Sequence, residues 1–259
     1  MNTSVPALAT FAASLALLVA WGPGKELATS SREGRAATLA QNKAEKHKKT
    51  EPAPPNSALL AEDKGKLRIL LDGQLVGTEE FSIKPSTNAW TARGTTDIHT
   101  SASASRVTAT LQLAPDGAPR HYEWSAQGPK KASATIEFLE GTAKIALQMN
   151  GSQPFLQELS FGSPRVLVLD NNLYHHYAIL ARLYDWKARG SQTFPVLIPQ
   201  DMTPGSLTVE SAGPENVEGA VYEVLHVSTA DIEVRLYLDS SHRLMRLAVP
   251  ASKAVVIRE

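Results

Sequence analysis

The stretch Asp170-Asn-Asn-Leu-Tyr-His-His-Tyr-Ala-Ile-Leu-Ala-Arg-Leu-Tyr-Asp-Trp186 predicts the one long helix of this chain. Asp170, Asn171 or Asn172 can cap its N-terminus, and Gly190 is suitably placed just beyond its C-terminus. Large apolar side chains recur at helical spacing and form one stripe: Leu173, Tyr177, Leu180 and Tyr184. Because the rest of the folded region is patterned as strands, we expect this helix to plug, close or line a β-rich domain.

Apolar and polar residues alternate in many short runs after residue 57, as they do in strands with one wet face. One such run, Leu67 to Leu71, stops at Asp72-Gly73. Other runs stop at Pro115-Asp116-Gly117, Glu140-Gly141, Asn150-Gly151 and Asp239 to His242. Asp, Asn and Gly tolerate the positive φ of tight hairpin turns. The pattern therefore predicts a mainly β fold, in which a long antiparallel meandering sheet curls into a roll and so protects its edges.

Two segments beside the helix read differently from the hairpins. The continuous apolar run Arg165-Val-Leu-Val-Leu169 predicts a strand buried on both faces. After the helix, Phe194-Pro-Val-Leu-Ile-Pro-Gln200 predicts a short strand whose prolines mark an edge or its two ends.

The first 56 residues differ in composition from the rest. Ala7 to Trp21 is apolar apart from Thr10 and Ser14, and resembles the hydrophobic region of an export signal. No Lys or Arg precedes this run and no Ala-x-Ala site follows it, so an uncleaved anchor is the alternative. We expect a signal peptide or anchor at 1–24, a flexible Lys- and Pro-rich linker at 25–56 and a single β-roll domain at 57–259.

The composition excludes several classes of function. The 26 basic and 26 acidic residues balance, so no basic field favours nucleic-acid binding. The chain has no cysteine, which excludes disulfides, a thiol nucleophile, thiolate metal sites and lipoprotein anchoring. No phosphate-binding loop, dinucleotide-binding glycine motif or Gly-x-Ser-x-Gly elbow occurs. Glu79 and Glu80 adjoin on a predicted strand, face opposite ways and cannot form a catalytic pair.

The adjacent histidines His175 and His176 raise the question of a metal or of acid–base chemistry. Neighbouring helical residues point about 100° apart, so the two cannot easily share one metal. Asp170 lies five residues before His175, which leaves a hydrolase centred on Asp170, His175 and His176 as a third alternative. We expect one histidine in the core and the other at the surface, with no catalytic residue, no metal and no cofactor.

The aromatic residues are the best remaining indication of function. Several gather on the helix, while Tyr122 and Trp124 sit two apart on one strand face. Aromatic rings with a polar tip suit the wall of a half-apolar cleft, although an ordinary core would use them too. The candidate ligand-binding residues are Tyr174, His175, His176, Tyr177, Tyr184, Trp186, Tyr122 and Trp124.

Three segments give the chain a resemblance to a known group of proteins. They are the hairpin from Gly65 to Gly77 with Leu70-Leu-Asp-Gly-Gln-Leu-Val-Gly77, the hairpin Leu113-Ala-Pro-Asp-Gly-Ala-Pro-Arg-His-Tyr122, and Leu169 to Tyr177 running into Val196-Leu-Ile-Pro-Gln200. With these the chain resembles bacterial exported proteins of unknown function that are related to a proposed glycolipid-binding family with the spiral β-roll fold. The resemblance implies a sheet wound around a central helix, with Tyr174 to Lys187 largely enclosed, and brings no catalytic residues.

These observations lead to one expected function and to alternatives from other classes. We expect an exported, non-enzymatic protein of the bacterial periplasm or cell envelope that binds an apolar or amphipathic, lipid-like ligand, such as a lipid or glycolipid. Its N-terminal segment would bring it near a membrane. The alternatives are an envelope interaction or assembly module that pairs with a protein partner through sheet edges, and the hydrolase named above.

Overall fold

The computed structural model describes residues 59–101, 103–200, 202–229 and 232–259. The expected signal peptide or anchor at 1–24 and the expected linker at 25–56 lie outside the described residues. Within the described ranges, no helix is long and apolar enough to cross a membrane.

The described residues form fifteen strands, one α-helix and one short 3₁₀ helix. The strands before the helix are β1 (Asp63–Leu71), β2 (Gln74–Ser86), β3 (Ala89–His99), β4 (Ala104–Leu113), β5 (Pro119–Gln127), β6 (Ala132–Leu139), β7 (Thr142–Met149), β8 (Phe155–Ser160) and β9 (Leu167–Val168). After the helix α1 (His175–Leu183) come β10 (Gln192–Ile198), β11 (Thr203–Val217), β12 (Ala220–Ser228), β13 (Glu233–Leu238), β14 (Leu244–Val249), the 3₁₀ helix η1 (Pro250–Ser252) and β15 (Ala254–Arg258).

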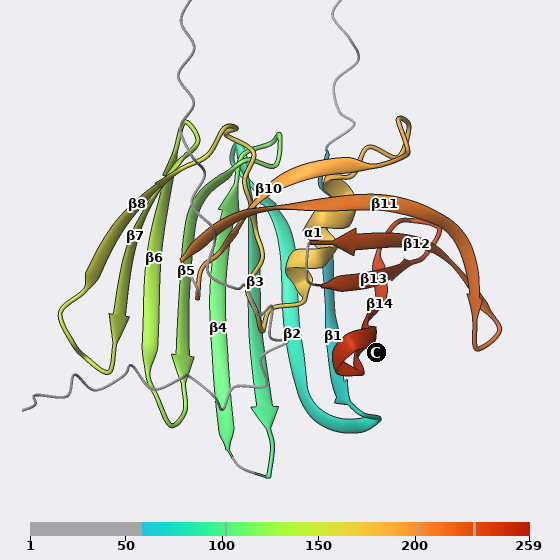
Figure 1. Cartoon of the computed structure of the whole chain (residues 1–259), viewed down its shortest axis with the longest axis horizontal. Helices are drawn as coiled ribbons and strands as arrows, with labels where there is room; N and C mark the ends of the chain where they lie inside the picture. The colour runs from blue at the N-terminus through green and yellow to red at the C-terminus, as the bar shows by residue number, and fades with distance from the viewer. Residues whose placement is uncertain (1–58, 102, 201, 230–231) are drawn as a thin grey trace, which may run out of the picture. The chain divides into compact units, whose positions relative to one another are not determined.

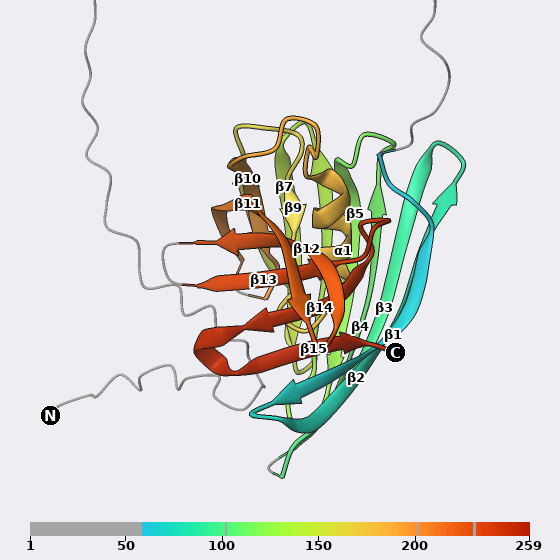
Figure 2. The ribbon, with the colours of Figure 1, turned by 90° about the vertical axis from the view of Figure 1, so that its right-hand side faces the viewer.

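All fifteen strands belong to one sheet in the order β8-β7-β6-β5-β4-β3-β2-β1-β15-β14-β13-β12-β11-β10-β9. The chain meanders outward from β1 to β8, crosses through β9 and α1, and meanders back from β10 to β15, which pairs with β1. Neighbouring strands are antiparallel except for β9 and β10. Both views show α1 between the first half of the sheet and the returning half (Figures 1 and 2). The sheet is not closed, and the expected antiparallel meander around one helix is confirmed.

The hairpin turns explain how the sequence specifies this meander. In Asp72-Gly73, Glu140-Gly141 and Asn150-Gly151 both residues have positive φ, as the tightest hairpin turns require. Glycine adopts this conformation without strain, and Asp and Asn tolerate it better than other residues do. These turns lie where the alternating patterns predict them.

The helix is shorter than the sequence predicts. It covers nine residues, His175–Leu183, and its N-cap is Tyr174, whose side chain makes no capping hydrogen bond. The predicted caps Asp170, Asn171 and Asn172 therefore lie before the helix, and Gly190 lies beyond a further turn. The reason is the tertiary contact of the helix N-terminus with a distant strand, described below.

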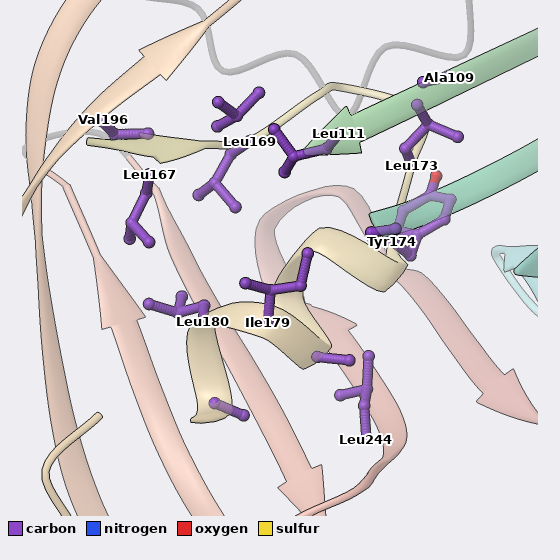
Figure 3. Packing of buried hydrophobic residues seen from close by; sticks show 14 of the residues in the cluster. Ala109, Leu111, Leu167, Leu169, Leu173, Tyr174, Ile179, Leu180, Val196 and Leu244 are labelled. Carbon is purple, nitrogen blue, oxygen red and sulfur yellow. The ribbon is translucent and has the colours of Figure 1, made fainter. Parts of the chain in front are cut away.

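Side chains from both halves of the sheet enclose the helix. Leu180 and Tyr184 of the predicted stripe are buried, whereas Tyr177 is only partly buried. Figure 3 shows Ile179 and Leu180 among buried side chains that include Leu111 of β4 and Leu167 of β9. The run Val166 to Leu169 is fully buried, as predicted, although only two of its residues form a strand.

A buried ion pair joins the two ends of the folded domain. The Arg258 guanidinium on β15 contacts the Asp63 carboxylate on β1 at 2.5 and 3.1 Å, and both side chains are buried. The Asp63 carboxylate offsets the cost of burying the Arg258 charge. The pair therefore holds β15 against β1, where the two halves of the sheet meet.

Candidate functional site

A buried carboxylate from β2 caps the N-terminal end of α1. Glu79 Oε2 accepts a hydrogen bond from the Tyr174 N–H at 2.7 Å, and Oε1 accepts one from the His175 N–H at 3.3 Å. The first amides of a helix have no partner within the helix and need acceptor oxygens from elsewhere. Glu79 thus performs the capping that the sequence assigns to the local Asp170, Asn171 or Asn172.

The same carboxyl group contacts the His175 ring through Nδ1. Both side chains are completely buried, so the charged form of each is disfavoured. Burial raises the pKa of Glu79 to about 8, against the lowering effect of the two backbone N–H groups. Burial also lowers the pKa of His175 to about 3. At neutral pH the pair therefore holds one shared proton and carries no net charge.

The second histidine belongs to a neighbouring buried group. The Asp170 N–H donates to His176 Nδ1 at 3.2 Å, while the Tyr122 hydroxyl donates to the Asp170 carboxylate. Burial raises the pKa of Asp170 to about 6, and the hydrogen bond from Tyr122 opposes this. Burial lowers the pKa of His176, and the nearby Val168 carbonyl opposes that shift. The two imidazole rings are in edge contact, with centroids 4.5 Å apart.

Gly94 on β3 makes room for the His175 ring. The ring stacks on Phe81 with centroids 5.7 Å apart. A Cβ atom on the neighbouring Gly94 would lie 2.6 Å from His175 Nδ1 and 3.0 Å from Glu79 Oε1. Contacts this short do not occur between real atoms, so glycine is required where β3 passes beneath the ring.

Several buried polar atoms in this region have no hydrogen-bond partner among the described residues. They are Trp124 Nε1, Asn172 Oδ1, Tyr174 Oη, His175 Nε2 and His176 Nε2. Buried polar atoms usually have partners, and four of these five belong to the segment from Asn172 to His176, so the start of the helix is unusual. Because His176 Nδ1 accepts a hydrogen bond, the proton of the neutral ring lies on its Nε2.

A second aromatic group lies at the other end of the helix. The Tyr184 hydroxyl donates to the Gly190 carbonyl at 2.7 Å, and Trp186 Nε1 donates to the Ala181 carbonyl at 3.0 Å. The Trp186 ring stacks on His242 with centroids 3.9 Å apart. These contacts hold the chain after the helix against the β13–β14 turn. The Tyr184 hydroxyl and Trp186 Nε1 both have a hydrogen-bond partner.

The structure thus brings the predicted ligand-binding residues together in two places. Tyr122, Tyr174, His175 and His176 lie near the N-terminal end of α1, and Tyr184 and Trp186 lie at its C-terminal end, with Tyr177 between them. Trp124 is the next inward-facing residue after Tyr122 on β5. All are buried except Tyr177 and Trp186, which are partly buried. That these residues bind a ligand remains a prediction.

For the histidines and for Glu79 and Glu80, the structure corrects one expectation, confirms another and reveals a role that was not expected. The expected split of the histidines between core and surface is wrong, because both rings are buried against the sheet. Glu79 and Glu80 do face opposite ways, as predicted, with Glu80 exposed. The role of Glu79 is not foreseen, although it lies in phase with the inward-facing Phe81 and Ile83.

The arrangement does not resemble a working acid–base centre. The Asp170 carboxylate bonds to Tyr122 and the Asn172 N–H, while only its backbone N–H reaches His176. Asp170, His175 and His176 are each at most 3% exposed. A general base must reach the proton that it removes from a substrate. Within the described ranges, moreover, no cluster of three or more His, Asp or Glu side chains is placed to hold a metal ion.

Two adjacent rows of inward-facing side chains connect this buried cluster with one end of the sheet. The row through Phe81 crosses seven strands: Phe81, Gly94, Ala109, Trp124, Ala134, Leu147 and Phe155. The row through Glu79 crosses six: Glu79, Thr96, Val107, Ala126, Ala132 and Met149. Cross-strand neighbours share a face of the sheet, so each row is one continuous strip.

Both rows emerge from the core at the strands β6, β7 and β8. Leu147 is buried, but its neighbour Phe155 is 55% exposed, and Met149 is 42% exposed. Phe138 and Leu159, on the same face, are partly buried. We call these four residues, Phe138, Met149, Phe155 and Leu159, the apolar wing. An exposed group of large apolar side chains on a soluble domain commonly marks an interaction site.

Comparison with known proteins supports the fold and assigns no activity. No protein-family model matches the chain, and no curated protein matches it in sequence. Among solved structures, a β-barrel-like protein of the domain of unknown function DUF1849 from Brucella abortus superposes with a TM-score of 0.53 at 9% identity, covering 76% of this chain and 94% of that one.

A DUF1089 family protein from Pseudomonas aeruginosa superposes less well, with a TM-score of 0.42 at 9% identity over 67% of this chain and 90% of that one. The first likeness shows that the chain has a β-barrel-like fold. This agrees with an uncharacterised family of β proteins.

Proposed function

We propose that this protein is an exported, non-enzymatic protein of the bacterial cell envelope that binds an amphipathic, lipid-like ligand on its apolar wing. The observation that carries the proposal is the emergence of two continuous inner rows at Met149 and Phe155, where the apolar strip leaves the core. An acyl chain lying across β6 to β8 would cover side chains that are otherwise in water.

The row of side chains that ends at Phe155 in the apolar wing is long enough for a chain-like ligand. Trp124 and Phe155 lie in the same row and are separated by three strand spacings, which is about 14 Å. The side chains between them, Ala134 and Leu147, are apolar. Burial of apolar surface stabilises a complex by roughly 25 cal/mol per Å².

Export and the kind of ligand rest on the sequence. The apolar run Ala7 to Trp21 supports an export signal or anchor, which would bring the domain near a membrane. The resemblance to exported proteins related to a proposed glycolipid-binding family supports a lipid or glycolipid as the ligand. The burial of Glu79, Asp170, His175 and His176, each at most 3% exposed, supports a non-catalytic role.

A fluorescence titration tests the binding surface. The probe is undecanoate carrying a dansyl group, with unlabelled palmitate as the competitor. The double substitution Met149→Lys and Phe155→Lys places two charges on the strip and should weaken binding at least about tenfold, which corresponds to about 1.4 kcal/mol.

The control substitutes two exposed apolar residues elsewhere, Leu75→Lys and Val221→Lys, which are 55% and 67% exposed. It should bind the probe like the wild type. Thermal unfolding of both variants confirms that the sheet is intact. Equal affinities for the two double variants would contradict binding at the apolar wing.

A further inference from the structure

The two ends of the sheet differ in their exposure. At one end β9 has two residues, both buried. At the other end β8 has six residues, of which Phe155, Leu156, Glu158 and Ser160 are exposed. Among the described residues, no strand pairs with the side of β8 that faces away from β7. Within the part of the chain that the structure describes, the backbone N–H and C=O groups on that side have no strand partner and can bond another chain.

This edge lacks the features that usually prevent strand association. It contains neither Lys nor Pro, and Glu158 is its one charged residue. Its pairing with β7 runs without a bulge from Thr142–Ser160 to Leu147–Phe155. Natural edge strands are commonly protected by lysine, proline, bulges or a covering segment. The net charge of the whole chain is zero, so two copies do not repel one another.

We propose that β8 pairs antiparallel with β8 of a second copy of this chain, around a two-fold axis that passes through Gln157. Opposite residues in a sheet share a face, so the inward-facing residues of one copy must meet inward-facing residues of the other. With Gln157 on the axis, Phe155 meets Leu159 of the second copy and Leu156 meets its Glu158.

Charge and apolar contact select this register over its neighbour. A shift of the axis to Glu158 would place two carboxylates opposite each other, which destabilises a strand pair. In the proposed register the two amides of Gln157 face each other and can hydrogen-bond. The inner row that ends at Phe155 then continues into Leu159 and Ala143 of the second copy. Two apolar wings become one surface, a self-complementary interface of two-fold symmetry.

Cysteine cross-linking tests the register, because the chain has no cysteine of its own. In the full chain, Gln157→Cys places two thiols opposite each other, within the separation that a disulfide spans. Mild oxidation at micromolar protein should give mainly covalent dimer on a non-reducing gel.

The matched control is Ser160→Cys on the same strand. Ser160 is more exposed than Gln157. Its two copies would lie about 20 Å apart across the axis, beyond the reach of a disulfide. It should give less than about a tenth of the dimer formed by Gln157→Cys. Equal yields from the two variants would show random collision and overturn the proposal.

Sedimentation equilibrium of the delipidated full chain tests the charge pattern independently of any ligand. Leu156→Glu faces Glu158 of the second copy and should weaken the dimer at least about tenfold, whereas Leu156→Lys gains an opposite charge and should stay within about threefold of the wild type.

The control is Leu139→Glu, which lies on the same outer face but on β6, away from the edge. It should dimerise like the wild type. A wild type that stays monomeric up to millimolar concentration, or an equal loss for the two Leu156 variants, would overturn the proposal. Neither result depends on lipid binding, so the two proposals can fail separately.

Discussion

Glu79→Gln should remove most of the pH dependence of stability in the mildly alkaline range. The Glu79 carboxyl group is completely buried, and its pKa is raised from 4.5 to about 8. The folded state therefore holds the proton more tightly than the unfolded state does. The stability that this group contributes is fully present below pH 4.5 and is lost as the pH rises towards 8.

The size of the effect follows from the pH window. Below pH 6.5 the buried histidines oppose the trend, because their lowered pKa values make the folded state less stable as the pH falls. The contribution of Asp170, whose pKa is about 6, also lies mainly below this point. Between pH 6.5 and 8 Glu79 has the largest shift. Against the lowering effect of burial, Glu123 and Glu137 also raise the pKa of His121, but this smaller contribution is common to the wild type and Glu79→Gln. One proton over 1.5 pH units corresponds to roughly 2 kcal/mol of unfolding free energy.

Glutamine at position 79 preserves two of the three hydrogen bonds of Glu79 without the titration, and loses only the longest one, from the His175 N–H. Its amide oxygen can accept from the Tyr174 N–H, and its NH₂ group can donate to His175 Nδ1. Urea unfolding, followed by tryptophan fluorescence at pH 6.5, 7, 7.5 and 8, should show a loss of roughly 2 kcal/mol for the wild type and little change for Glu79→Gln. The adjacent, exposed Glu80→Gln should keep the wild-type slope. A Glu79→Gln variant that loses as much stability as the wild type would refute the reasoning.

Two further substitutions test how the helix is enclosed. Leu180→Ala should destabilise the domain by roughly 2–5 kcal/mol because its side chain is fully buried, whereas the exposed Lys187→Ala should cost less than about 0.5 kcal/mol; similar small losses in urea unfolding would contradict the central position of the helix. Gly94→Ala should cost about 1–3 kcal/mol, since the added Cβ meets the His175 ring, while Gly162→Ala, with no atom within 4 Å, should be neutral within about 0.5 kcal/mol in the same measurement. An unaffected Gly94→Ala would show that the ring does not press on β3.

The strands with clear alternation could be predicted from the sequence, because burial on one face imposes a period of two. This holds for β1, β4 and β7, whose turns also carry residues that tolerate positive φ. The alternation is not visible in β3, because Gly94 and Thr96 occupy inward positions next to the start of the helix. The prediction also fails for β11, whose Pro204, Gly213 and Pro214 look like breaks but lie in a strand with a bulge.

The candidate site could be predicted only in part. The aromatic and histidine residues of the helix stand out in the sequence, and the structure does gather them. Glu79 lies 96 residues before His175, so no local pattern reveals their contact. Its phase with Phe81 and Ile83 is the one local sign that it points inward. The helix start could not be placed correctly for the same reason, since its cap comes from another strand.

The most direct test of the proposed function is mass spectrometry of lipids extracted from the full chain after purification from its native envelope. The wild type should carry one class of lipid or glycolipid in a stoichiometric amount. The Met149→Lys and Phe155→Lys double variant should lose it, while the Leu75→Lys and Val221→Lys control should retain it. A folded wild type that carries no lipid above the level of the wing variant would contradict the account.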